Sequence, residues 1–331
     1  MNVAISRFPP IATATAADGG RASKRPTEPP LTPDSPVIAL AYRSLRHEYR
    51  SLLKRQPRHG TTPTPEDVHQ IRTATRRMRV TLRLFGALLP QRAATRLGKD
   101  LRWFARALGT VRDLDVHAEA LHEHVRSLGA VAVQELGDYE VALQRERVAA
   151  HDTLRDLVAS DRYAGLMTTL SELLDGAPSP AALRRWGSFT IRAGAARYVK
   201  RSRKRVLKLR RQLGGDASAD DLHRLRKRAK QLRYALEFFI EPYPALSPAA
   251  KATKTLQDVL GAHQDARTAR GRVLAYTRAL RKRHGANVAP PGALRAWGTA
   301  QHQRAAQARR EFAPEWERFL TALDLTDVDL R

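Results

Sequence analysis

Two stretches of this 331-residue chain decide its fold: VHQIRTATRRMRVTLRLF at residues 68–85 and LHRLRKRAKQLRYALEFF at residues 222–239. They align at an offset of 154 residues, which places His69 on His223 and Phe85 on Phe239. In each stretch the apolar residues recur every three or four positions, which is the period of an amphipathic α-helix. The chain is therefore predicted to contain a duplicated helical unit.

The repetition extends beyond this helix in both directions. At the same offset of 154 residues, a run of basic residues upstream falls on basic residues of the second copy. Downstream, an offset of 152 residues pairs Gly109 and Asp113 with Gly261 and Asp265. Two repeats are therefore predicted, at residues 36–178 and 179–331. The matched basic residues are Arg43, Arg46, Arg50 and Lys54 with Arg197, Lys200, Lys204 and Lys208, and Lys99 and Arg102 with Lys251 and Lys254.

The remaining pattern is helical almost to the end of the chain. Alternating apolar and polar runs of the strand type are absent, which favours an all-α fold with helices long enough for bundles. Residues 1–35 are rich in Pro, Ala, Thr and Gly and have no periodic apolar face, so we expect a disordered tail there. Helices are expected at residues 37–55, 65–89, 91–108, 112–128, 130–158, 161–175, 181–212, 219–241, 247–261, 264–284 and 290–324.

The charge balance restricts the class of partner. The chain has 59 Lys and Arg against 33 Asp and Glu, a formal net charge of +26. A chain this basic repels itself unless it meets a polyanion, and nucleic acid, an acidic membrane surface and polyphosphate are the candidates. There is no cysteine, so disulfides and thiolate metal sites are excluded. No apolar run is long enough to span a membrane, and a cytoplasmic protein is expected.

The basic residues of the repeated helix share one face. At 100° per residue, His69, Arg72, Arg76, Arg79 and Arg83 fall within roughly 80° of each other. Like charges stacked at this spacing destabilise a helix, and an anionic ligand is the simplest source of relief. The alternative is an ordinary solvated face, which the recurrence in both repeats argues against. The predicted polyanion-binding residues are Arg43, Arg46, Arg50, Lys54, His69, Arg72, Arg76, Arg79, Arg83, Lys99, Arg102, Arg197, Lys200, Lys204, Lys208, His223, Arg226, Lys230, Arg233, Lys251 and Lys254.

The two histidines that begin these basic faces have two interpretations. Each could contact phosphate, as a neutral donor or as a protonated group beside a polyanion. Each could instead bond a neighbouring carboxylate such as Asp113 or Asp265. A metal site needs several convergent ligands, which the H-x-x-R spacing does not supply. His117, His122 and His124 also lack an evident third ligand at suitable spacing, so no metal is predicted.

The sequence contains none of the common catalytic motifs. There is no phosphate-binding P-loop, no H-E-x-x-H zinc motif and no G-x-S-x-G elbow. Acids that could hold Mg²⁺ are not clustered beside the basic faces, and Asp113, which follows Leu108 and Gly109, is interpreted as a helix cap. Phosphoryl transfer normally needs positioned metals and a nucleophile. We therefore expect a protein that is not an enzyme and needs no cofactor.

The two His-headed stretches resemble the CHAD family, the conserved-histidine α-helical domains. The family pattern is a histidine followed by Arg three residues later, Lys or Arg seven later and Arg ten later, and both stretches match it. The motifs from Leu108 to Asp113 and from Leu260 to Asp265 resemble the turn that follows in the family. The likeness covers about residues 37–325. It implies two pseudo-symmetric four-helix bundles around a basic central channel or groove, binding of inorganic polyphosphate and association with polyphosphate granules.

Three hypotheses follow. The first is a non-catalytic polyphosphate-binding module whose basic faces grip a thin anionic chain from both sides. The second is a nucleic-acid-binding protein, which the composition alone would favour. Aromatic residues make up only 6% of the chain and none is assigned to the basic faces, so base stacking would have few platforms. The third is an enzyme acting on phosphate polymers, which the missing acid cluster argues against.

Overall fold

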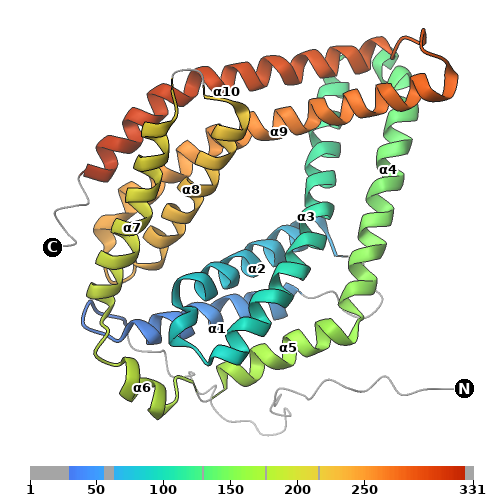
Figure 1. Cartoon of the computed structure of the whole chain (residues 1–331). Helices are drawn as coiled ribbons and strands as arrows, with labels where there is room; N and C mark the ends of the chain where they lie inside the picture. The colour runs from blue at the N-terminus through green and yellow to red at the C-terminus, as the bar shows by residue number, and fades with distance from the viewer. Residues whose placement is uncertain (1–29, 56–62, 129, 176, 215–216, 325–331) are drawn as a thin grey trace, which may run out of the picture. The chain divides into compact units, whose positions relative to one another are not determined.

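The computed structural model describes residues 30–55, 63–128, 130–175, 177–214 and 217–324, and within these ranges it is all-α (Figure 1). The described residues form no strand, and the isolated bridge between Pro36 and Thr190 is the extent of their β pairing. The helices are α1 (Val37–Arg55), α2 (Pro65–Phe85), α3 (Gln91–Leu128), α4 (Ala130–Val158), α5 (Asp161–Leu174), α6 (Pro180–Trp186), α7 (Ile191–Gln212), α8 (Ala219–Phe238), α9 (Ser247–His284) and α10 (Gly292–Asp324), with 3-10 turns at Gly86–Leu88 and Pro244–Leu246.

Two predicted helix breaks do not exist. Residues 91–108 and 112–128 belong to the single helix α3, and residues 247–261 and 264–284 belong to α9. Each helix has 38 residues and runs through its glycine, Gly109 or Gly261, without interruption. A glycine inside a helix costs only about 1 kcal/mol, which the packing along such a long helix outweighs.

One predicted helix is in fact two. Residues 181–212 divide into α6 and α7, and the chain between them contains the new N-cap Thr190. The Thr190 hydroxyl accepts a hydrogen bond from the Ala193 amide at 3.3 Å, which satisfies one of the free amides of the first turn of α7. The residues that precede α1 pair with the backbone at the start of α7. The Ile191 amide donates a hydrogen bond to the Ser35 carbonyl at 2.8 Å.

The predicted tail is therefore too long at its C-terminal end. Residues 1–29 lie outside the described residues, but Leu31 is buried in the main hydrophobic core. Its amide donates to a carboxylate oxygen of Glu241 at 3.2 Å, and the Arg192 amide donates to the Pro33 carbonyl at 2.8 Å. Residues 31–35 lack helical periodicity, and they are fixed by these contacts with distant segments.

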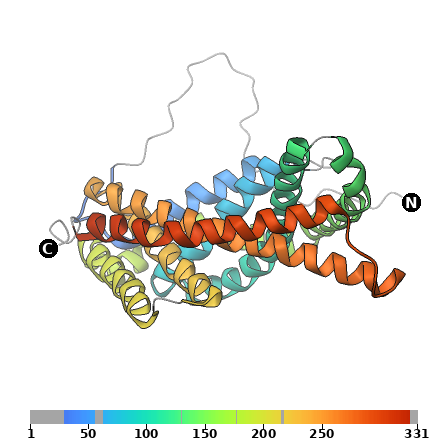
Figure 2. The same cartoon turned by 90° about the horizontal axis from the view of Figure 1, so that it is seen from above.

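The core does not divide at the predicted repeat boundary. The main cluster contains Leu45 and Phe85 from the first predicted repeat together with Phe239 and Phe319 from the second. A second cluster joins the C-terminal part of α3, α4, α9 and the start of α10, with Trp297 among its members. Helices α9 and α10 run side by side in both views (Figures 1 and 2). Each cluster thus draws on both halves of the sequence, and the division at residue 179 stays a prediction.

No described helix combines the length and the apolar character that a membrane span requires.

Candidate functional site

Helix α2 begins with a capping box. The Thr64 hydroxyl accepts from the Asp67 amide at 3.1 Å, and an Asp67 carboxylate oxygen accepts from the Thr64 amide at 3.3 Å. This capping box fixes the first turn and hence the rotation of the helix. Ile71 and Met78 are buried in the core, as their spacing predicts. The basic face that begins at His69 consequently lies beside the core and is only partly exposed.

Helix α8 repeats this construction. Ser218 and Asp221 form the matching capping box, with the Ser218 hydroxyl accepting from the Asp221 amide at 3.1 Å. Leu225 and Leu232 are fully buried on one side of the helix. On the neighbouring side, four residues of the predicted site are half-buried: His223, Arg226, Lys230 and Arg233.

The basic faces of α2 and α8 approach each other. The two helices are in contact, and burial lowers the pKa of Lys230 to about 7, with Arg76 the strongest of the charged neighbours that lower it further. Arg226 and Arg72 also contribute to this shift, so residues from both helices act on one ammonium group. Burial, together with Arg233 and Arg72, lowers the pKa of Arg76 as well. The structure therefore gathers cations from distant segments into one partly buried cluster.

An aromatic residue lies inside this cluster, contrary to the expectation that the basic faces contain none. The guanidinium carbon of Arg76 lies 5.5 Å from the centre of the Tyr234 ring, and that of Arg233 lies 5.1 Å from it. Tyr234 itself is buried, and burial raises its pKa. Cation–π attraction of this kind helps to hold two guanidinium groups in one place despite their mutual repulsion.

The interpretation of Asp113 as a helix cap is wrong, because Asp113 lies within α3. Its carboxylate is 4.0 Å from Nη2 of Arg72. Burial raises the pKa of Asp113, Arg72 opposes the rise, and Asp265 of α9 adds to it. Asp113 and Asp265 are the two residues matched at the offset of 152, so both helices bring their equivalent carboxylate to the same place. Two acids therefore accompany the cationic cluster, and they lie near its arginines.

Neither histidine is hydrogen bonded to these carboxylates within the part of the chain that the structure describes. Burial lowers the pKa of His69, and Arg112 lowers it further. Burial also lowers the pKa of His223, although a hydrogen bond with Gln264 acts in the opposite direction. Nδ1 of each imidazole is buried without a hydrogen-bond partner among the described residues, and so is Nε of Arg76. Leaving a buried polar atom unpaired costs about 1–3 kcal/mol, a cost that functional sites often carry.

The predicted site residues on α1 divide into two pairs. Arg43 lies 2.5 Å from a carboxylate oxygen of Glu241, and Arg46 donates to the carbonyls of Leu174 and Ala177 near the end of α5. These partners give Arg43 and Arg46 a structural role that their spacing did not reveal. The other pair, Arg50 and Lys54, is exposed.

The predicted residues on α7 are all exposed. Helix α7 packs along α8, and its matched cations face solvent. None of the four is seen in an ion pair with a described carboxylate. They are Arg197, Lys200, Lys204 and Lys208.

The remaining predicted cations flank the central cluster. Arg79 lies near Arg83 and Arg102, which together with burial lower its pKa. In the predicted second repeat, Lys254 is paired with Asp258 at 3.1 Å, and Lys251 is exposed.

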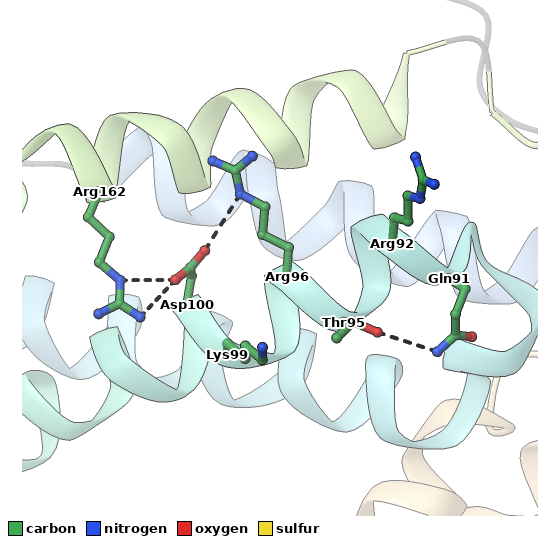
Figure 3. A pocket seen from close by; sticks show the side chains of 7 residues that line it. All are labelled: Gln91, Arg92, Thr95, Arg96, Lys99, Asp100 and Arg162. Atoms are coloured by element: carbon green, nitrogen blue, oxygen red, sulfur yellow. Dashed lines mark hydrogen bonds and ion pairs between the residues drawn. The ribbon is translucent and has the colours of Figure 1, made fainter.

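Lys99 borders a cavity of about 480 Å³ near the start of α3. Figure 3 shows Asp100 between Arg96 and Arg162, where it accepts two hydrogen bonds from Arg162 at 3.0 and 2.9 Å. Arg162 also covers the Trp103 ring at 4.3 Å. Asp100 and Trp103 thus engage Arg162, one of the four cations that line this cavity.

The three histidines considered as metal ligands have other roles. His117 is bonded through Nε2 to the Tyr139 hydroxyl at 2.7 Å, and burial lowers its pKa to about 4. His124 packs against Trp297 with ring centres 4.9 Å apart, and His122 lies 3.8 Å from Glu140. The described residues contain no group of three or more His, Cys, Asp or Glu side chains placed to hold a metal ion.

Comparison with known proteins gives a consistent family. A family model described as the CHAD domain matches residues 43–274. Two Mycobacterium tuberculosis proteins, from strains CDC 1551 / Oshkosh and H37Rv and both described as uncharacterized, are 26% identical over 270 residues. The match covers 76% of this chain, and the chain spans about half (50%) of the length of those relatives.

Two solved structures have the same fold. PptA from Streptomyces chartreusis matches with a TM-score of 0.64 and 20% identity, over 86% of this chain and 100% of that one. The crystal structure of the CHAD domain from the plant Ricinus communis matches with a TM-score of 0.64 and 24% identity, over 92% of this chain and 97% of that one. At these identities the likeness concerns the fold.

Proposed function

The chain belongs to the CHAD domain family, and from this premise we propose that it binds inorganic polyphosphate without catalysing a reaction on it. The observation that carries the proposal is the approach of the α2 and α8 basic faces at Arg76 and Lys230. We place the centre of the binding site there, with His69, Arg72, His223, Arg226 and Arg233 around it.

Polyphosphate suits this cluster chemically. Arginine offers two parallel hydrogen bonds to phosphate oxygens, and lysine offers a mobile point charge. A flexible, unbranched chain of phosphates is thin enough to lie between two helices. Its charge would offset the repulsion between cations that, in addition to burial, lowers the pKa of Arg76 and Lys230. When polyphosphate binds, the unpaired Nδ1 atoms of His69 and His223 would gain hydrogen-bond partners.

A role without catalysis fits the composition of the cluster. Asp113 and Asp265 are its carboxylates, and Arg72 lies beside the first of them. In this arrangement the acids orient and partly neutralise arginines. A measurement of phosphate release from polyphosphate, with and without Mg²⁺, tests this part of the proposal, and turnover dependent on Arg72 would contradict it.

Nucleic acid is the alternative partner. Tyr234 is the aromatic residue of the cluster, and it is buried under Arg76 and Arg233. It therefore supports the arginines and offers no open face on which a base could stack. The backbone phosphates alone would then have to supply the affinity.

A competition experiment separates the two partners. Fluorescently labelled polyphosphate bound to the full chain is displaced with unlabelled polyphosphate or with single-stranded DNA at equal phosphate concentration. We expect unlabelled polyphosphate to compete at a concentration at least about tenfold lower, because DNA places its charges farther apart and adds bulky bases. Equal competition by DNA would contradict the proposal. Association with polyphosphate granules in the cytoplasm is a further expectation, which imaging of a tagged chain tests.

A further inference from the structure

Two matched sets of residues in the predicted repeats carry very different charge. We define the first-repeat face as Arg79, Arg83, Lys99, Arg102, Arg106 and Arg112, on α2 and α3. The second-repeat face consists of the residues matched to them at offsets of 154 and 152, on α8 and α9: Arg233, which also borders the proposed centre, Glu237, Lys251, Lys254, Asp258 and Gln264. The formal charge is +6 on the first face and +1 on the second.

Four cations of the first-repeat face converge. Burial lowers the pKa of Arg79, and Arg83, Arg102 and Arg106 lower it further, in that order. Within the described residues, these four guanidinium groups are not seen in an ion pair with any carboxylate. Arg112 of α3, which lies 4.0 Å from Glu119, is near enough to His69 of α2 to lower its pKa, and α2 and α3 pack against each other.

The second-repeat face is neutralised by its own acids. Glu237 lies 3.3 Å from Nε of Arg233, and Asp258 lies 3.1 Å from Nζ of Lys254. Both acids stand at positions where the first repeat has arginine, Arg83 and Arg106. Compared with the first-repeat face, the second has two cations fewer, and its acids pair with Arg233 and Lys254. Lys251 remains as an exposed cation without a described carboxylate partner.

We propose that a polyphosphate chain longer than the centre can hold leaves it over the first-repeat face and not over the second. This inference rests on the proposed function, since it assumes that polyphosphate occupies the centre. A polyanion follows the surface where its charges replace repulsion between cations, and the convergence around Arg79 supplies that surface. On the other side the chain would have to displace Glu237 and Asp258 from their partners and would meet their charge.

Matched charge reversals in the two repeats test the proposal. One variant carries Lys99→Glu and Arg102→Glu, and the other carries Lys251→Glu and Lys254→Glu at the equivalent positions. All four residues are exposed, and both variants change the net charge by the same amount. The probes are tripolyphosphate, which is short enough to stay at the centre, and long-chain polyphosphate of narrow length distribution.

We expect the first variant to bind long-chain polyphosphate at least about tenfold more weakly. The slope of log affinity against log salt concentration should become shallower by about 1.4, the value for two lost phosphate contacts. Its affinity for tripolyphosphate should change by less than about twofold. The second variant should bind both probes as the unchanged chain does. Equal losses of long-chain affinity in the two variants would overturn the one-sided path, as would an unchanged first variant.

The short probe separates this inference from the function on which it rests. Tripolyphosphate that binds the unchanged chain and both variants alike supports the central site, whatever the long-chain result. Failure of the unchanged chain to bind either probe would refute the proposed function itself. Circular dichroism of each variant shows whether the helices persist, and a variant that unfolds is replaced by its glutamine counterpart.

Discussion

Arg76 of α2 lies close enough to Lys230 of α8 to lower the pKa of its ammonium group, and the two are equivalent residues of the predicted repeats, 154 positions apart. Asp113 and Asp265, matched at an offset of 152, meet in the same way. A residue meets its own counterpart only near an axis that relates two copies. These two contacts are therefore the ones that a two-fold relation between the repeats would produce, with α2 and α3 facing α8 and α9.

The first prediction concerns Arg72 and Arg226. Replacing both with glutamine removes two cations from the centre while keeping polar side chains beside Asp113 and Asp265. Charge-assisted hydrogen bonds contribute roughly 1.5–3 kcal/mol each, so polyphosphate affinity should fall at least about a hundredfold. Calorimetric titration measures the loss.

A control for this variant is Lys282→Gln with Arg283→Gln, in the exposed last turn of α9. These positions lie about 27 Å from Gln264 along the helix axis. If the control loses as much affinity as the Arg72 and Arg226 variant, polyphosphate senses overall charge and the central site has to be abandoned.

The second prediction is a pH dependence of binding. The pKa of Lys230 is about 7 in the free protein, so the side chain is mostly neutral above that pH. A bound polyanion favours the charged form and raises the pKa, which means that binding takes up a proton. Affinity should therefore rise about tenfold as the pH falls from about 8 to about 6.

Lys230→Arg provides the comparison, because an arginine keeps its charge across this range. Its affinity should be nearly constant with pH, apart from a contribution of His69 and His223 at the acid end, where their lowered pKa values lie. A slope as steep in Lys230→Arg as in the unchanged chain would show that another group takes up the proton.

The third prediction separates stability from binding. Asp115 is buried in α3 and accepts hydrogen bonds from Nε and Nη2 of Arg147 at 3.1 and 2.9 Å. Asp115→Ala would leave the half-buried guanidinium without this partner, at a cost of about 3 kcal/mol in the free energy of unfolding. Denaturant titration measures this cost. Polyphosphate affinity below the unfolding transition should stay the same, and a loss of affinity would mean that Asp115 supports the site.

The fourth prediction concerns the segment before α1. Leu31 is 9% exposed and packs in the main core, so Leu31→Ala should lower the free energy of unfolding by about 2 kcal/mol. Thermal or denaturant unfolding checks this value. An unchanged stability would restore the interpretation of residues 31–35 as part of a dispensable tail.

The sequence predicted the helices well where their pattern is local. Periodicity located α1, α2 and α8, and the apolar spacing of Ile71 and Met78 correctly placed them in the core. The prediction failed at Gly109 and Gly261, because the sequence alone does not distinguish a glycine inside a long helix from a glycine in a turn. The packing contacts that keep these helices continuous come from distant segments. It also missed the break before Thr190, whose capping role resembles that of any helix-start threonine.

The candidate site was predicted less completely, for a physical reason. Helical spacing gives the direction of a side chain on its own helix, and this was enough to place Arg72 and Arg226 on basic faces. Which helix meets that face depends on the packing of distant segments, so Tyr234 was missed, and the approach of Asp113 to Arg72 and Asp265 was not predicted. The partners that hold Arg43 and Arg46, such as Glu241, are likewise remote in sequence and leave no local signal.

The shared core has a consequence for synthesis on the ribosome. Trp316, Phe319 and Leu323, in the last turns of α10, pack in the same cluster as Val37 near the start of α1. This cluster can close only after nearly the whole chain has left the exit tunnel, so the apolar faces of the early helices remain open to water while translation proceeds. We expect a nascent chain halted after the first repeat to depend on chaperones and to aggregate when they are absent.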